Sequence, residues 1–147
     1  MISENKYYFI DTDAATKIKR EFIKSPFFRN YCALTEENIY ELRENNNVDL
    51  FSKCQIEIDP TILSALPAVW GKIDISDKIF NLYRNEGNGD IIMIAALLSQ
   101  TEQGRTQLFN NTLILVTDDK GLTTIAKEFS FAVIESDAFI KILEANK

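Results

Sequence analysis

Two hydrophobic segments of this 147-residue chain end in pairs of carboxylates. The run YYFI is followed by Asp11 and Asp13, and the run TLILV is followed, after one threonine, by Asp118 and Asp119. Carboxylates repel one another and are costly to bring together away from water, so something must offset that cost. A divalent cation is the simplest candidate, because carboxylate oxygens are the ligands that hard ions such as Mg²⁺ and Mn²⁺ prefer.

The composition excludes several other kinds of chemistry. The chain has no histidine, which rules out serine–histidine and cysteine–histidine catalysis and histidine-ligated zinc. Two cysteines, Cys32 and Cys54, are too few for a disulfide framework, and their apolar neighbours predict buried thiols. The net charge of −6 argues against broad non-specific binding to nucleic acid or membranes and favours the recruitment of cations.

No membrane or export signal is evident in the sequence. The N-terminal MISENKYYFID lacks a basic start and a long apolar stretch, and the longest apolar run, residues 91–98, is too short to cross a bilayer. We therefore expect a cytoplasmic protein with no membrane partner.

Strands and helices alternate along the chain. Apolar runs predict strands at residues 7–10, 31–34, 112–116 and 131–135. Helical spacing predicts one helix from Ala14 to a stop at SPF (25–27), one after Thr35 that ends near 45–47, and others at 75–83, 91–98, 122–129 and 139–143. Thr35 is the predicted N-cap of the second helix, but Asn38 stands where the capping box would have Glu, so that pattern is incomplete. Ile39 and Leu42 are predicted to face inward. The stretch 48–70 gives no clear pattern. This order predicts a single domain over residues 1–147, a three-layer α/β/α sandwich with a central, mainly parallel sheet.

In such a sheet the ligand site lies beyond the carboxyl ends of the strands, which is where the paired acids fall. Asp90 opens the apolar helix 91–98 and is a further candidate. Each acid alone also fits a helix cap or a turn, which requires no chemistry. Glu37 and Glu41 share one face of the helix after Thr35, a spacing that permits a place at the rim of a cleft and equally fits a solvated surface.

Three cations are candidates for binding a phosphate. Lys17 and Arg20 lie on the predicted helix after Asp11, and Lys120 is next to Asp119. An ordinary solvated surface explains them equally well.

Four segments, in this order, resemble the PIN domain, a metal-dependent nuclease module of RNA-processing proteins and of bacterial toxin–antitoxin pairs. YFIDTDAA resembles the opening strand with its first acid, Asp11. TEENIYELRE resembles the second segment, which points to Glu41, with Glu37 one turn earlier as the fallback. NGDIIMIAALL resembles the third, which gives Asp90. The likeness covers nearly the whole chain, and its first and fourth segments are the more specific.

LILVTDDKGL resembles the fourth segment, which places Thr117 and Asp119 in the site and makes Asp118 the variable position. The family often has Asn where this chain has Asp13. The resemblance implies that Asp11, Asp90 and Asp119 are the main ligands of Mg²⁺ or Mn²⁺, and that Glu41 holds a ligand water or a second ion. Asp13 and Thr117 would be supporting groups. The implied activity is an endoribonuclease, with RNA as the substrate and with an antitoxin protein or a second copy of the chain as partners.

Two alternatives stay open. FIDTDAAT also resembles the start of haloacid-dehalogenase phosphatases, Asp-x-Asp-x-Thr, but Ala15 holds the threonine position and Thr16 comes one residue later. The lysine which that family uses has no clear counterpart. The chain could instead be a PIN-like scaffold of weak catalytic power that binds RNA or a protein. Against the scaffold, all four acid positions are filled.

Overall fold

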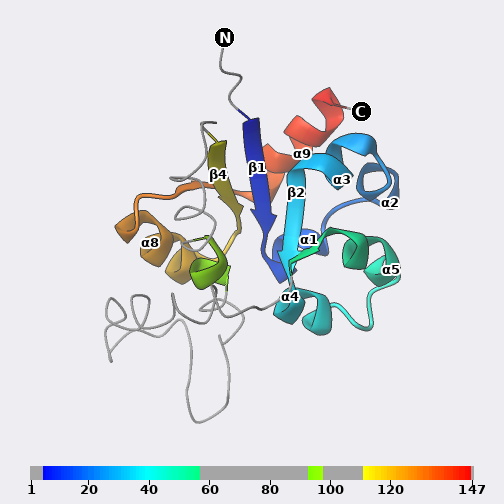
Figure 1. Ribbon diagram of the computed structural model, residues 1–147, viewed down its shortest axis with the longest axis horizontal. Coiled ribbons are helices and arrows are strands. Elements are labelled where there is room, and N and C mark those ends of the chain that lie inside the picture. The colour runs from blue at the N-terminus through cyan, green and yellow to red at the C-terminus, as the bar shows by residue number, and fades with distance from the viewer. Residues whose placement is uncertain (1–4, 57–92, 98–110, 147) are drawn as a thin grey trace.

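The computed structural model describes residues 5–56, 93–97 and 111–146 of the chain. Its centre is a parallel sheet of order β3-β2-β1-β4-β5 (Figure 1). The strands are β1 (Asn5–Ile10), β2 (Cys32–Thr35), β3 (Gln55–Ile56), β4 (Asn111–Val116) and β5 (Ala132–Ile134). The predicted α/β class with a parallel sheet is therefore confirmed. The predicted strands match β1, β2, β4 and β5 to within two residues at each end, and β3 lies within the stretch 48–70, which has no clear pattern in the sequence.

The register of the two central strands brings their carboxyl ends level. Along their whole length β1 and β4 are paired, from Asn5 with Asn111 to Ile10 with Val116. The backbone N–H of Asp11 then donates to the carbonyl oxygen of Val116 at 3.0 Å. The residues that follow the two strands therefore start from the same level of the sheet edge.

Alternate residues of these strands pack on opposite faces of the sheet, which creates two separate cores. Ile10 and Val116 belong to one core, whereas Phe9 and Leu115 belong to the other. The first core is covered by residues of α1 (Thr12–Ala15), α2 (Arg20–Ile23), α3 (Pro26–Tyr31), α5 (Val48–Phe51) and α9 (Ser136–Ala145). The second is covered by α8 (Lys120–Glu128) and the helical residues 93–97. The sheet thus lies between two helical layers.

The sequence predicted one continuous helix from Ala14, and this prediction was wrong because the helix is interrupted. The backbone of Lys19 is extended, with φ −72° and ψ 147°, so α1 and α2 are two short helices. The turn between them contains a bond from the N–H of Ile18 to the carbonyl of Ala15, a spacing of three residues that winds tighter than an α-helix. Ile18 and Phe22 are buried nonetheless. The apolar spacing therefore identified the inward face but not the break.

The segment SPF ends α2 as predicted, but it also begins α3, a helix that was not predicted. The hydroxyl of Ser25 accepts a hydrogen bond from the N–H of Phe28 at 3.2 Å, which makes Ser25 the N-cap of α3. Pro26 occupies the first turn, where its missing N–H has no cost. Phe28 is fully buried at the centre of this helix.

Helix α4 (Glu36–Glu41) begins at the predicted N-cap, Thr35, but ends at Glu41 rather than near 45–47. The capping box that looked incomplete in the sequence is complete, because the amide oxygen of Asn38 replaces the usual carboxylate. Ile39 and Leu42 are buried, as predicted.

The described residues also test the predictions for the cysteines, for two later helices and for part of the stretch 48–70. Both cysteines are buried free thiols. Leu122 and Ile125 line the inner face of α8, and Phe139 and Leu143 that of α9. Within the unclear stretch 48–70, the described part forms α5, a 3-10 turn at Ser52–Cys54 and β3. The predicted helix 75–83 lies outside the described residues. In the described part of the chain, no helix has the length and apolarity that a membrane span requires.

Candidate functional site

The candidate site lies at the carboxyl edge of the sheet, toward which the arrows of β1, β2 and β4 all point in Figure 1. Asp11 directly follows β1, and Thr117, Asp118 and Asp119 directly follow β4. Helix α4 follows β2 and packs against α1. Three neighbouring strands therefore deliver polar side chains to one edge.

Asp11 is the most buried acid of this edge, with 6% of its surface exposed. One carboxylate oxygen, Oδ1, accepts from the backbone N–H of Thr12 at 2.8 Å and caps α1. The other, Oδ2, accepts from the hydroxyl of Thr117 at 2.9 Å. Both oxygens are thus oriented by the protein.

The pKa of Asp11 is raised, first because burial disfavours the charged form and then because Asp13 and Asp119 carry like charges nearby. The hydrogen bonds from Thr117 and Thr12 act in the opposite direction. Asp11 is thus an acid whose negative charge is only partly compensated by its described protein neighbours. A cation beside it would supply the missing compensation.

Thr117 connects the ends of β1 and β4. Its side chain is fully buried, and its hydroxyl donates to Asp11 while accepting from the backbone N–H of Asp119 at 3.1 Å. The N–H of Thr117 itself donates to the carbonyl of Ile134 in β5 at 3.0 Å. One residue therefore positions the main acid of β1 and the turn that carries the acid of β4.

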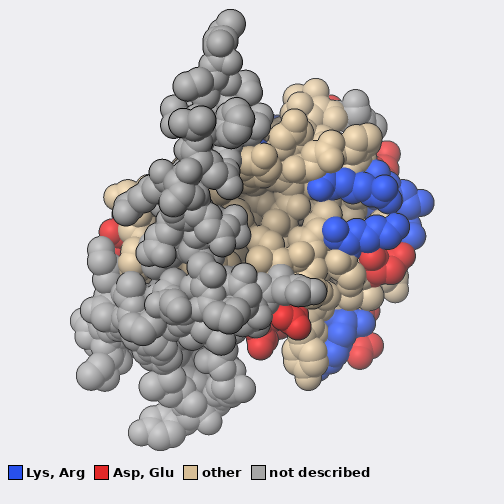
Figure 2. Space-filling model, viewed as in Figure 1, with Lys and Arg blue, Asp and Glu red and all other residues tan. Residues whose placement is uncertain are grey.

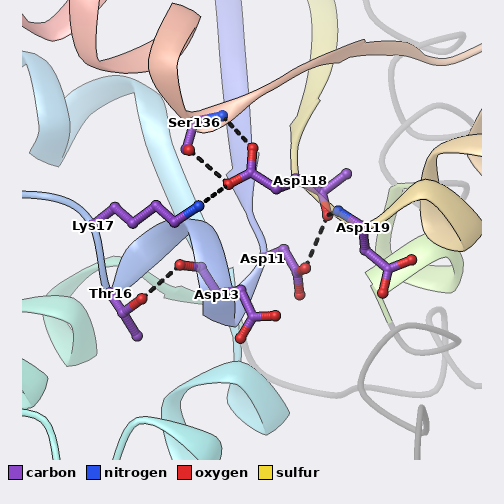
Figure 3. A network of polar contacts seen from close by, with 8 residues as sticks. Asp11, Asp13, Thr16, Lys17, Asp118, Asp119 and Ser136 are labelled. Carbon is purple, nitrogen blue, oxygen red and sulfur yellow. Dashed lines mark hydrogen bonds and ion pairs between the residues drawn. The ribbon is translucent and has the colours of Figure 1, made fainter.

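Asp119 and Asp13 complete the group around Asp11. Asp119 is half-buried and caps α8, because its Oδ1 accepts from the N–H of Leu122 at 2.9 Å. Asp13 is exposed in the first turn of α1, and its backbone carbonyl accepts from the hydroxyl of Thr16 at 2.6 Å. In Figure 3 the carboxylates of Asp11, Asp13 and Asp119 all point away from the strands, toward the same side.

Glu41 reaches the same site from α4. The residue is exposed overall, but the pKa of its carboxyl is raised, first by loss of solvent around the group and then by the charges of Asp11, Glu37 and Asp13. An interaction with the side chain of Thr12 partly opposes this rise. The structure thus brings Glu41 close enough to Asp11 and Asp13 for their charges to interact. Glu37 is half-buried one turn earlier.

Two residues that the sequence indicated only as helix-capping residues, Thr35 and Asn38, position this second acid. The side-chain amide of Asn38 donates to the hydroxyl of Thr12 at 2.9 Å, and its oxygen accepts from the hydroxyl of Thr35 at 2.7 Å. Asn38 and Thr35 are buried. This amide joins α4 to α1, and the incomplete capping pattern around Thr35 was the one signal in the sequence that could have drawn attention to it.

Asp118, the predicted variable position, has a structural role. Its carboxylate accepts from both the backbone N–H and the hydroxyl of Ser136, at 2.8 and 2.6 Å, and pairs with the ammonium of Lys17. In Figure 3 it points away from the three other aspartates. Partial burial raises its pKa, but the hydrogen bonds from Lys17 and Ser136 outweigh this and lower the pKa to about 2. Asp118 therefore ties the start of α9 to the β4 turn.

The three cations predicted to hold phosphate differ in their contacts within the protein. Lys17 is the partner of Asp118. Arg20 donates to the side chain of Asn47 at 3.1 Å and lies 3.7 Å from a carboxylate oxygen of Asp49. Lys120 is exposed at the first position of α8. Lys17 and Arg20 would therefore have to exchange partners within the protein to contact a phosphate, whereas no such contact is described for Lys120.

The donor set suits a hard divalent ion in its chemistry, because it consists of carboxylate and hydroxyl oxygens. Within residues 5–56, 93–97 and 111–146, no three acids or cysteines lie close enough to hold one ion together. Mg²⁺ commonly keeps several waters and uses only one or two protein carboxylates, a requirement that Asp11 and Asp119 can meet. Asp90, the third expected ligand, lies outside the described residues.

Comparison of the chain with protein-family models and with curated proteins finds no match in either case.

Proposed function

We propose that the chain is a metal-dependent endoribonuclease that hydrolyses RNA phosphodiesters with Mg²⁺ or Mn²⁺. The observation that supports this most is the buried hydroxyl of Thr117, which hydrogen-bonds Asp11 and the backbone of Asp119 at once. This hydroxyl bonds the carboxylate that follows β1 to the turn that carries the acid after β4. Together with the four sequence segments that resemble the PIN domain, it favours a cation site.

The position of each residue would determine its role in binding the ion or a water. Asp11 and Asp119, with Asp90, would hold the ion directly or through water. Glu41 carries a carboxyl of raised pKa at the edge of this group and would bind a water by a hydrogen bond. A bound ion lowers the pKa of a coordinated water, and this supplies hydroxide near neutral pH in a chain that has no histidine. Thr117 and Asn38 would keep the acids in place.

The biological setting of this activity rests on the resemblance alone. Toxins of toxin–antitoxin pairs contain this module, so an antitoxin partner and a homodimer belong to the proposal. Lys120 would be the cation most available to a phosphate of the RNA.

The test is cleavage of a pool of single-stranded and structured RNAs with Mg²⁺ or Mn²⁺. The native protein should cut, and Asp11→Asn should not, because the substitution removes the charge of the central acid. Asp49→Asn is the matched control, since Asp49 is an exposed acid on α5 whose ion pair with Arg20 is solvated. Cleavage that survives Asp11→Asn would refute the site. No cleavage by the native protein would favour the binding scaffold, and hydrolysis of small phosphoesters alone would favour the phosphatase.

A further inference from the structure

Tyr40 is the one large hydrophobic side chain that the described part of the chain leaves exposed, with 62% of its surface accessible. It lies on α4, whose inner side is formed by the buried residues Asn38 and Ile39. Exposed aromatic rings are costly to leave in water, and a flat ring is a good surface for a second flat ring. This side chain is therefore a candidate for ligand binding.

Arg43 holds the ring of Tyr40 in place. The centre of its guanidinium lies 4.4 Å from the ring centroid, and its Nη1 donates to the backbone carbonyl of Tyr40 at 3.0 Å. These two contacts place the guanidinium over one face of the ring. A guanidinium has five N–H donors, so the contact to one carbonyl leaves most of them for an anion.

The pair stands beside the candidate site. Tyr40 precedes Glu41, whose carboxyl interacts with the charges of Asp11 and Asp13. Tyr40 is therefore adjacent in sequence to the acid that α4 brings to this site. Figure 2 shows acidic and basic side chains at the lower edge of the coloured surface, the part of the view in which Figure 1 draws α4.

We propose that Tyr40 and Arg43 form a stacking platform for one unpaired base of a single-stranded RNA whose backbone passes the acidic site. The base lies on the ring face of Tyr40 that Arg43 does not cover, and Arg43 contacts an adjoining phosphate. This inference rests on the proposed nuclease function and assigns to Tyr40 and Arg43 the contact with one unpaired base and its phosphate.

A base fits these observations better than a protein surface does. Protein interfaces have an apolar core of many residues, whereas a single ring is enough to stack one base. Glu37 and Glu41 lie on the same helix as Tyr40, and their carboxylates repel a phosphate, so Arg43 is the neighbouring group that could contact one. Base-paired RNA keeps its bases stacked within the helix and cannot use the platform.

The experiment measures binding and stacking separately from cleavage. The probe is a ten-nucleotide single-stranded RNA with 2-aminopurine at one position, moved along the strand, whose fluorescence is quenched when the base stacks. Protein with Asp11→Asn is titrated with this probe in Mg²⁺, with and without Tyr40→Ala. Loss of one base stack should weaken binding about 5- to 100-fold and abolish the quench at one probe position. Tyr40→Phe keeps the ring and should bind within about twofold of the parent.

Arg43→Ala should also weaken binding and should reduce the slope of log affinity against log salt concentration by about 0.7, the value for one phosphate contact in single-stranded nucleic acid. Arg29→Ala, an exposed arginine on α3, is the matched control and should change neither. Circular dichroism and thermal melting check that each variant folds.

The possible outcomes distinguish the stacking platform from the proposed nuclease function. Quenching lost with Tyr40→Ala supports the platform even if the native protein cuts no RNA. Cleavage by the native protein with equal RNA affinity and equal quenching in Tyr40→Ala refutes the platform and leaves the nuclease standing. Absence of any RNA binding refutes the platform, and capture of a protein partner through Tyr40 with no effect on RNA would do the same.

Discussion

The hydroxyl of Thr117 lies between the carboxylate of Asp11, 2.9 Å away, and the backbone nitrogen of Asp119, 3.1 Å away. Asp11 and Thr117 are 106 positions apart in the chain, yet the pairing of Ile10 with Val116 makes them neighbours. This contact joins the two strand ends on which the candidate site is built. It gives the first prediction.

Thr117→Val should lower the free energy of unfolding by about 1–3 kcal/mol, because it leaves a buried carboxylate oxygen of Asp11 without its donor. Thr117→Ser keeps the hydroxyl and should cost less. Urea unfolding at pH 7 measures both. Thr124→Val, at an exposed position of α8, is the matched control, and an equal loss in the two valine variants would contradict the role given to Thr117.

Mn²⁺ should raise the melting temperature of the native protein, because an ion that binds only the folded state also relieves the repulsion among Asp11, Asp13 and Asp119. At ten times the dissociation constant, the stabilisation is about 1.4 kcal/mol, which corresponds to a shift of about 3–6 °C in a chain of this size. Thermal melting with millimolar Mn²⁺ and with EDTA measures it.

The same shift should disappear in Asp11→Asn and persist in Asp49→Asn. Native protein that melts at the same temperature with and without the metal would count against the cation site. A shift that survives in Asp11→Asn would place the ion elsewhere on the molecule.

The Asp118 contacts should make a pH-dependent contribution to stability. The pKa of Asp118 is about 2 in the folded protein, against an ordinary value of 3.8, so the folded state favours the charged form. The contribution is therefore fully present above the ordinary pKa and is lost as the pH falls through about 2. Asp118→Asn should reduce the free energy of unfolding at pH 7 and make progressively less difference at pH 4, 3 and 2.

Urea unfolding of the native protein and the variant at these pH values tests this. Asp49→Asn again serves as the control, because its solvated ion pair with Arg20 is of the kind that contributes little. A difference between native and Asp118→Asn that stays constant from pH 7 to pH 2 would show that the charge of Asp118 is not what stabilises α9.

The sequence predicted the features of this fold that depend on hydrophobic periodicity. The runs before Asp11 and Thr117 are uniformly apolar because both faces of the central strands are buried, and this pattern identifies a parallel sheet. The sheet edge then follows from the direction of the strands. That is why the positions of Asp11 and Asp119 could be predicted without a structure.

The features that depend on a single side chain meeting a distant partner could not be predicted. Asn38 is polar and reads as a surface residue, but it is buried because Thr12 and Thr35 satisfy its amide. The resemblance marked Asp118 as the variable position, but its bonds to Ser136, eighteen residues away, could not be predicted. Lys19 breaks a helix whose apolar spacing continues through the break.

The place of β1 at the centre of the sheet determines when the site can form during synthesis. One neighbour of β1 is β2, made soon after it, but the other is β4, which begins at Asn111. At translation speeds of about 5–20 residues per second, at least several seconds pass between the synthesis of Asp11 and that of Thr117. The nascent chain therefore carries an incomplete candidate site until β4 and Thr117 have left the ribosome.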